Sequence, residues 1–236
     1  MSTIKTDSIT AVSTNTAISI KGLGSGVVKL GDGELKFPDA DGSANQIIET
    51  DGAGQLSFTA KPSGGLVLVQ TLTLSGASTA TLTAAALFDG TYDRIQIEGT
   101  AIDTSAAAAF NMTLSDDGGS TFESANYRFH TAAVVDGSTT YTAYISATAS
   151  VVEVLHLTGS NADESAEFTI KTGNLVDTAF HKIFYWHGAT MNATAYNFCT
   201  GVGGWAGGVT AIDQIRFLPA SGTFSGVIRA YGLIDS

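Results

Sequence analysis

Short runs in which apolar and polar residues alternate follow one another along most of the chain after residue 65. Tyr92–Gly99 (YDRIQIEG), Glu167–Lys171 (EFTIK) and Lys182–Trp186 (KIFYW) are the clearest of them. A strand has a side-chain period of two, so each run predicts a strand with one buried face. Further predicted strands are Leu66–Leu74, Phe110–Leu114, Thr121–His130, Tyr141–Ala147, Val151–Leu157, Tyr196–Cys199, Thr210–Leu218 and Thr223–Leu233.

These strands are separated by turn signals, and no long segment has the period of a helix. Asp116–Gly119 (DDGG) predicts a hairpin between the strands on either side of it. The Ala-rich stretch Ala80–Leu87 predicts at most a turn of helix. Many short strands joined by turns are typical of an antiparallel β-sandwich, and we expect one of jelly-roll type.

The stretch before this region contains one short pattern twice. Gly31–Phe37 (GDGELKF) and Asp51–Phe58 (DGAGQLSF) each place a turn rich in Gly and Asp before Leu-x-Phe. Leu and Phe two residues apart make a narrow apolar edge, which is too small to form a core by itself. Such an edge becomes stable when copies stack or when several chains combine their edges. The sequence thus predicts a segment of short strands that stacks on copies of itself or combines with other chains.

Lys61–Gly65 (KPSGG) interrupts both patterns, because Pro and two Gly residues follow one another there. We therefore expect two parts. Residues 1–62 form an N-terminal repeat and docking segment, and residues 63–236 form the C-terminal β-sandwich.

The repeated stretch resembles the repeats in the shafts of bacteriophage tail fibres. The resemblance rests on Leu30–Pro38 (LGDGELKFP) and Gln46–Phe58 (QIIETDGAGQLSF), and Thr223–Ser236 also resembles the last strand of jelly-roll domains in phage fibre and spike proteins. It implies a homotrimeric structural protein of a virion. It does not imply which structural protein.

Composition and charge exclude several partners. Charged residues make up 14% of the chain, against about a quarter in an average protein, and the formal net charge is −11. Phosphate groups repel so acidic a surface, so we expect no nucleic-acid binding. No apolar run is long enough to cross a bilayer as a helix, so we expect no membrane insertion.

The sequence carries no signature of catalysis, of a cofactor or of a metal site. The four histidines follow no metal-binding spacing, and Cys199 has no second cysteine to pair with. The carboxylate groups at Asp116/Asp117 and at Asp163/Glu164/Glu167 lie on or beside predicted turns. Two such groups across a cleft would allow glycan hydrolysis, which we keep as the least favoured interpretation.

Residues 180–205 combine aromatic residues with glycines. We expect most of these rings to pack in the core or at an interface between chains, because large rings contribute much of the buried area there. If the protein binds a glycan, the candidate residues are Trp186, His187, Tyr196 and Trp205, on loops.

Two functions from the same class follow. The first is a non-enzymatic fibre or spike on a phage virion, attached to other virion proteins by its N-terminal part and exposing a C-terminal knob to the host surface. The alternative is a head fibre or cement protein that decorates and stabilises the capsid.

Overall fold

The computed structural model describes residues 42–43, 46–53, 55–60, 65–161, 163–173, 175–192 and 195–233. The chain divides into two compact units, Met1–Pro62 and Ser63–Ser236, and each is treated by itself below. The first repeat, Gly31–Phe37, and the polar stretch before it lie outside the described residues.

The described residues are almost entirely strands. The first unit contains β1 (Gln46–Thr50) and β2 (Leu56–Ala60). The second contains β3 (Val67–Ala77), β4 (Ala80–Leu82), β5 (Arg94–Thr104), β6 (Ala108–Ser115), β7 (Tyr127–Val135), β8 (Thr142–Ala149), β9 (Val152–Thr158), β10 (Ala166–Thr172), β11 (Lys182–Asn192), β12 (Ala195–Trp205), β13 (Gln214–Pro219) and β14 (Phe224–Leu233). The helical element among them is η1, a single 3-10 turn at Ala85–Leu87.

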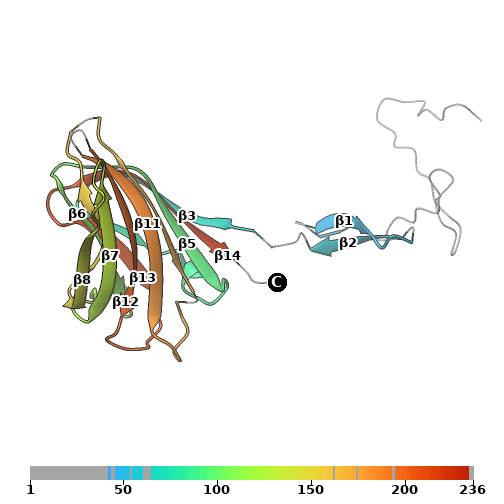
Figure 1. Ribbon diagram of the computed structural model, residues 1–236. Helices are drawn as coiled ribbons and strands as arrows, with labels where there is room; N and C mark the ends of the chain where they lie inside the picture. The colour runs from blue at the N-terminus through green and yellow to red at the C-terminus, as the bar shows by residue number, and fades with distance from the viewer. Residues whose placement is uncertain are drawn as a thin grey trace, which may run out of the picture. The chain divides into compact units, whose positions relative to one another are not determined.

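In the first unit, β1 and β2 form an antiparallel hairpin (Figure 1). Asp51 closes its turn, because its Oδ1 accepts the backbone N–H groups of Ala53 at 2.7 Å and Gln55 at 3.0 Å. All five residues of β1 are exposed, including Ile47 and Ile48, and Phe58 on β2 is only half-buried. The hairpin therefore encloses no core.

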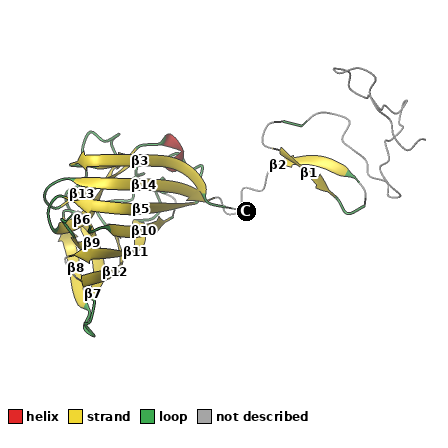
Figure 2. Cartoon of the chain, turned by 90° about the horizontal axis from the view of Figure 1, so that it is seen from above, coloured by secondary structure: helices red, strands yellow, loops and turns green. Residues whose placement is uncertain are grey.

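In the second unit, two antiparallel sheets contain all the strands. The larger has the order β3-β14-β5-β10-β11-β12-β7-β8 and the smaller has the order β4-β13-β6-β9. Figure 2 shows β3, β14, β5 and β10 side by side in the larger sheet. Without β7, β8, β11 and β12, the chain passes between β3-β14-β5-β10 and β4-β13-β6-β9 at each step except from β6 to β9, which are neighbours in the smaller sheet. This order is consistent with a jelly-roll sandwich.

Aromatic rings from both sheets meet in one core. The Phe110 ring of β6 lies 5.0 Å from the Phe224 ring of β14 and 5.6 Å from the Phe168 ring of β10. Phe217 of β13 packs at 6.1 Å from Phe110 and at 5.6 Å from Phe168. These four rings tie the small sheet to the first half of the large one.

The expected all-β fold with antiparallel sheets is confirmed, and the hairpin at Asp116–Gly119 is a wrong prediction. The chain does turn there, but β6 belongs to the small sheet and β7 to the large one. Both edges of β6 are occupied, by β13 and by β9, so β7 pairs with β12 and β8 instead. A turn signal in the sequence predicts that the chain reverses its direction. It does not determine which strand the next strand pairs with.

No helix among the described residues is long and apolar enough to span a bilayer.

Candidate functional site: the outer face of the large sheet

The four aromatic and histidine candidates lie on two paired strands. The sequence analysis had placed them on loops, and that prediction is wrong. Trp186 and His187 belong to β11, and Tyr196 and Trp205 belong to β12. Side chains alternate across a sheet, so neighbours in sequence separate. Trp186 and Trp205 point inward and are 2% and 5% exposed, whereas His187 and Tyr196 point outward. The two indole rings are thus inaccessible to a sugar at the surface.

The glycines of this region give the indole rings their space. Gly201 lies opposite Trp186 in the β11–β12 register, and a Cβ at Gly201 would stand 2.3 Å from the indole ring. A Cβ at Gly207 would likewise stand 2.6 Å from the Trp205 ring. Close packing of a large ring against bare backbone explains why this segment is rich in both residue types.

The outward-facing side chains of β11 and β12 form an apolar strip, which we define as Ile183, Tyr185, Phe198 and Val202. Their exposed fractions are 51%, 59%, 51% and 41%. Tyr185 lies directly opposite Val202, so their side chains are cross-strand neighbours on the same face. The outward pair His187 and Thr200 lies between Tyr185–Val202 and Phe198, so the strip is apolar at both ends and polar between them.

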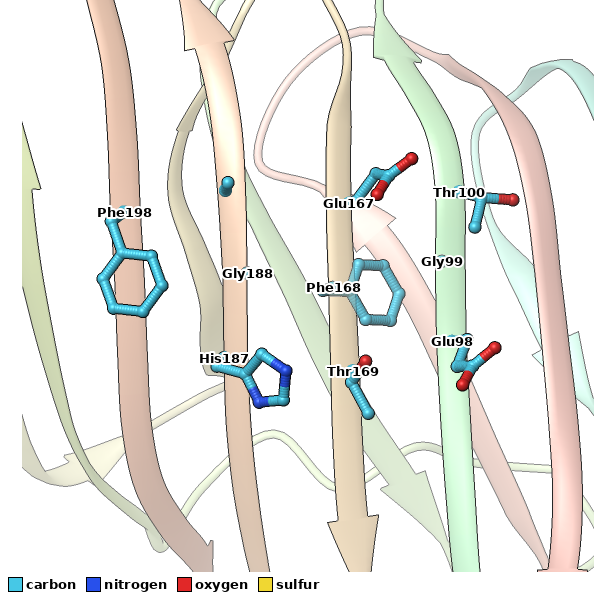
Figure 3. A pocket seen from close by; sticks show the side chains of 10 residues that line it. Glu98, Gly99, Thr100, Glu167, Phe168, Thr169, His187, Gly188 and Phe198 are labelled. Carbon is cyan, nitrogen blue, oxygen red and sulfur yellow. The ribbon is translucent and has the colours of Figure 1, made fainter. Parts of the chain in front are cut away.

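A shallow depression borders the apolar strip on the side of β10 and β5 (Figure 3). Its volume is about 320 Å³. It exists because the outward residues between Glu167 and Phe198 are small: Ala189 lies opposite both of them in the pairings of β11. It is lined by Glu98, Gly99, Thr100, Glu167, Phe168, Thr169, His187, Gly188, Ala189 and Phe198.

Charge is distributed unevenly around the apolar strip. On one side are the carboxylates of Glu98 on β5 and Glu167 on β10, and Glu98 accepts a hydrogen bond of 2.7 Å from Gln96. On the other side, β7 presents Arg128 and His130, which lie opposite Gly204 and Val202 of β12. The flank made by β10, β5 and β14 therefore carries both signs, because Lys171 lies opposite Tyr185 and Arg229 lies opposite Glu98. The flank made by β7 carries Arg128 and His130.

Two of the remaining carboxylates considered for catalysis, Asp117 and Glu164, hold loops in place. Asp117 accepts the N–H of Thr121 at 2.9 Å and its hydroxyl at 2.7 Å, and these bonds keep the pKa of the Asp117 carboxyl below its usual range. Glu164 is buried and accepts the N–H groups of Ser160 and Asn161 at 2.5 Å and 2.8 Å. Both carboxylates thus satisfy backbone donors of the turns in which they stand.

One histidine and the cysteine are neighbours, because Cys199 has a hydrogen bond with the backbone of His156. His156 stacks on Tyr144 with ring centroids 3.6 Å apart and bonds Glu153 at 2.8 Å, and His181 bonds the Gly208 carbonyl. Cys199 is buried, and this burial raises the pKa of its thiol. Within the described residues, no three His, Cys, Asp or Glu side chains are placed to hold a metal ion together.

The outer face is thus suited to lie against another surface rather than to enclose a small substrate. A scan against protein-family models, a search of curated proteins and a search of solved structures each gave no match. The sequence pattern contained part of the signal for this face, since Tyr185 and Phe198 alternate with buried residues. It contained none for Glu98, whose position beside β10 depends on sheet order.

Proposed function

We propose that this chain is a non-enzymatic structural protein of a bacteriophage virion, a homotrimeric fibre or spike. Its N-terminal segment attaches it to other virion proteins, and its C-terminal unit is a knob that contacts the host surface. The observation that carries the proposal is the β1–β2 hairpin, whose apolar side chains Ile47 and Ile48 are exposed. A two-stranded hairpin without a core is marginal in water, so it needs neighbouring chains. Repeats resembling those of tail-fibre shafts contain this hairpin.

The second unit supports the same proposal. Its strand order is consistent with a jelly roll, a fold that occurs in viral structural proteins. Its apolar strip provides a surface through which copies of the knob associate. Association of the knobs would set the register in which the N-terminal segments of the chains align along the stalk.

Host contact in this proposal falls on exposed aromatic residues at one end of the large sheet. Tyr141 precedes β8, Tyr196 is the second residue of β12, and both rings are largely exposed. The loop after β7 starts beside Tyr196, because the Asp136 N–H donates to the Tyr196 carbonyl at 2.7 Å. Exposed rings offer flat apolar faces to sugar rings, so host-surface glycan is the proposed ligand.

The host-contact proposal predicts that Tyr141→Ala and Tyr196→Ala weaken binding of the protein to host cells. Competition with purified surface polysaccharide is the accompanying measurement. The exposed apolar residue Leu68 lies on β3, away from this end, and Leu68→Ala serves as the matched control. Unchanged binding by both tyrosine variants would contradict glycan contact at this site.

The alternative proposal is a head fibre or cement protein that stabilises the capsid. The chain contains two clear copies of the repeat, whereas a long stalk needs many, and this favours a short appendage of either kind. Electron microscopy of virions labelled with antibody against the C-terminal unit separates the two. Label at the tail supports the fibre, label on the head supports capsid decoration, and unlabelled virions would overturn both.

A further inference from the structure

We infer that the depression beside Phe198 is a binding site for one sugar residue of a neutral glycan. The inference deepens the proposed host contact and rests on it: that proposal places glycan on the exposed ring of Tyr196, and the depression supplies polar groups next to this ring. Tyr196 and Phe198 are successive outward residues of β12, with Asn197 buried between them. Their rings therefore leave the same face of the strand, from Cα positions roughly 7 Å apart.

A row of polar side chains crosses the strands through the depression. Figure 3 shows His187, Thr169 and Glu98 side by side on β11, β10 and β5, where they are register partners. The row continues to Arg229 beyond Glu98 and to Thr200 beyond His187. Neighbouring strands lie about 4.8 Å apart, so these five positions span roughly 19 Å. A glycan chain laid across the strands would meet a polar group at each strand.

Three polar side chains that line the depression have no partner in the part of the chain that the structure describes. The carboxylate of Glu167, the hydroxyl of Thr169 and the imidazole of His187 make no side-chain hydrogen bond there. A carboxylate accepts hydrogen bonds, whereas a hydroxyl and a neutral imidazole both donate and accept. This set matches the hydroxyl groups of a sugar, because each of those is a donor and an acceptor as well.

The charges around the depression favour a neutral ligand. Glu98 and Glu167 repel an anion, and the formal net charge of −11 acts in the same direction. Arg229 lies opposite Glu98, and Lys171 follows Glu167 on β10, so the two carboxylates do not select a cation either. A purely apolar ligand would remove water from the polar groups without replacing their hydrogen bonds. A neutral ligand with many hydroxyl groups meets none of these costs.

The shape of the depression fits a ring that stays partly in solvent. Its volume of about 320 Å³ is near the lower end of the range for small-molecule sites, about 300–1,000 Å³. The half-exposed Phe198 ring forms one wall, against which a sugar can place its C–H groups. Association of knobs through Tyr185 leaves the site open, because Tyr185 is four residues from Ala189 along β11, roughly 13 Å.

The test is binding of the full-length chain to an array of hexasaccharides, followed by calorimetric titration with the neutral probe that binds best. The array carries neutral hexasaccharides of glucose, galactose and mannose, with those of glucuronic acid and glucosamine as anionic and cationic probes. Glu167→Gln removes a charged acceptor, Phe198→Ala removes the wall, and Ala189→Tyr fills the depression. The controls are Glu49→Gln in the first unit and Phe180→Ala, at an exposed ring that does not line the depression. Circular dichroism of each variant checks that the fold is intact.

We expect the wild-type chain to bind at least one neutral probe more tightly than either charged probe, with a Kd on the order of 0.1–1 mM, because an open site makes few contacts. Glu167→Gln and Phe198→Ala should each weaken binding about tenfold, the loss expected for one hydrogen bond to a charged group or one stacked ring. Ala189→Tyr should abolish binding, and both controls should bind like the wild type.

A second readout locates the ligand on the wild-type chain without any substitution. Diethyl pyrocarbonate modifies exposed imidazole rings, and mass spectrometry of peptides gives the rate at each histidine. The bound neutral hexasaccharide should slow modification of His187 severalfold. His181, which is also exposed but lies outside the depression, should react at an unchanged rate.

Several results would overturn the inference: no binding of a neutral probe, tighter binding of a charged one, unchanged binding by Ala189→Tyr, or no protection of His187. Loss of binding in Tyr196→Ala with unchanged binding in the three depression variants would also overturn it, and would leave host contact at Tyr196 standing. Neutral-glycan binding at the depression by a chain that antibody does not find on virions would overturn the virion proposal and leave the inference standing.

Discussion

At the scale of single residues, glycines and one tyrosine hydroxyl decide how the aromatic side chains fit. Gly201 faces the Trp186 ring at a distance that leaves no room for a methyl group. Tyr127 is fully buried, and its hydroxyl accepts the N–H of Leu114 at 2.7 Å. Pairing of β6 with β9 ends at Met112, so β9 provides no backbone acceptor for the N–H of Leu114. The Tyr127 hydroxyl is the acceptor instead.

Gly201→Ala should destabilise the folded unit by about 1–3 kcal/mol, because the new Cβ overpacks the buried indole ring. Urea denaturation measures the change. Gly65→Ala is the matched control, since a Cβ there meets nothing within 4 Å. The double variant Gly201→Ala with Trp186→Phe should recover part of the loss, and purely additive effects would contradict the contact.

Tyr127→Phe should cost about 1–3 kcal/mol, because it leaves the buried N–H of Leu114 without an acceptor. The measurement is again the free energy of unfolding from urea titration. Tyr141→Phe removes a hydroxyl from an exposed ring and should change that free energy little. Equal effects of the two substitutions would argue against the bond to Leu114.

Burial also raises the pKa of Tyr127 in the folded chain well above its usual value of 10.0. Between these two pKa values the unfolded chain loses this proton and the folded chain keeps it. The stability that depends on the neutral phenol is therefore complete below pH 10.0 and is lost as the pH rises further. Between about pH 10 and 11, wild type should lose stability more steeply than Tyr127→Phe. Parallel losses would contradict this account.

At the scale of elements, a bulge in β5 sets which of its residues reach the core. Gly99 pairs with Phe168 and Ile102 with Ala166, so β5 has one residue more than β10 between these pairs. The extra residue shifts the alternation: Ile95 and Ile97 point inward, and so does Ile102. Without the bulge, Ile102 would face solvent.

The bulge places Ala101 at a φ of 51°, in the left-handed region that costs a residue with a Cβ about 1–2 kcal/mol. Ala101→Gly should therefore stabilise the fold by up to about 1 kcal/mol. Gly226 of β14 lies beside the bulge and has a φ of 131°. A Cβ added at this position would stand 2.6 Å from the Ala101 carbonyl oxygen.

Gly226→Ala should consequently act in the opposite direction and destabilise. Thermal unfolding of the two single variants measures both effects. If Ala101→Gly lowered the midpoint, the strained conformation of Ala101 would be refuted.

At the scale of the whole molecule, the core belongs to the second unit. Its buried apolar cluster runs from Ala80 to Ala230, with contributions from both sheets. Residues 63–236 should therefore fold without the first unit, unfold in one cooperative transition and retain a thermal midpoint close to that of the full chain. Calorimetry of this fragment beside the full chain measures the midpoint.

The same fragment tests where association resides. If the apolar strip joins copies, residues 63–236 should still associate, although more weakly than the full chain. A monomeric fragment from a trimeric full chain would assign association to the N-terminal segment instead.

The sequence alone predicts nearly all strands of the second unit, because a period of two is a local property that each segment carries. Leu66–Leu74, Tyr92–Gly99 and Lys182–Trp186 all fall on observed strands. The structure of Ala80–Leu87 is harder to predict from sequence. It contains a strand of three residues and one 3-10 turn, and each is too short to give a recognisable pattern of apolar and polar residues. The shift between Ile97 and Ile102 was a readable sign of the bulge.

The order of the strands within each sheet could not be predicted from the local alternation of apolar and polar residues. Pairing brings together segments far apart in the chain, such as β5 with β10 and β12 with β7. The hairpin expected at Asp116–Gly119 failed for this reason. The placement of Trp186 and Trp205 inside, and of Tyr185 and Phe198 outside, likewise depended on which face of the large sheet the small sheet covers.

The order of apolar and polar residues, by itself, determined an all-β chain and the position of most strands, because backbone geometry turns alternation into two faces. The tertiary structure alone decided which face of each strand became core and which strands became neighbours. Those choices come from long-range packing of the Phe110 cluster and from the bulge in β5. They are also what joins Glu98, Glu167 and the apolar strip into one surface.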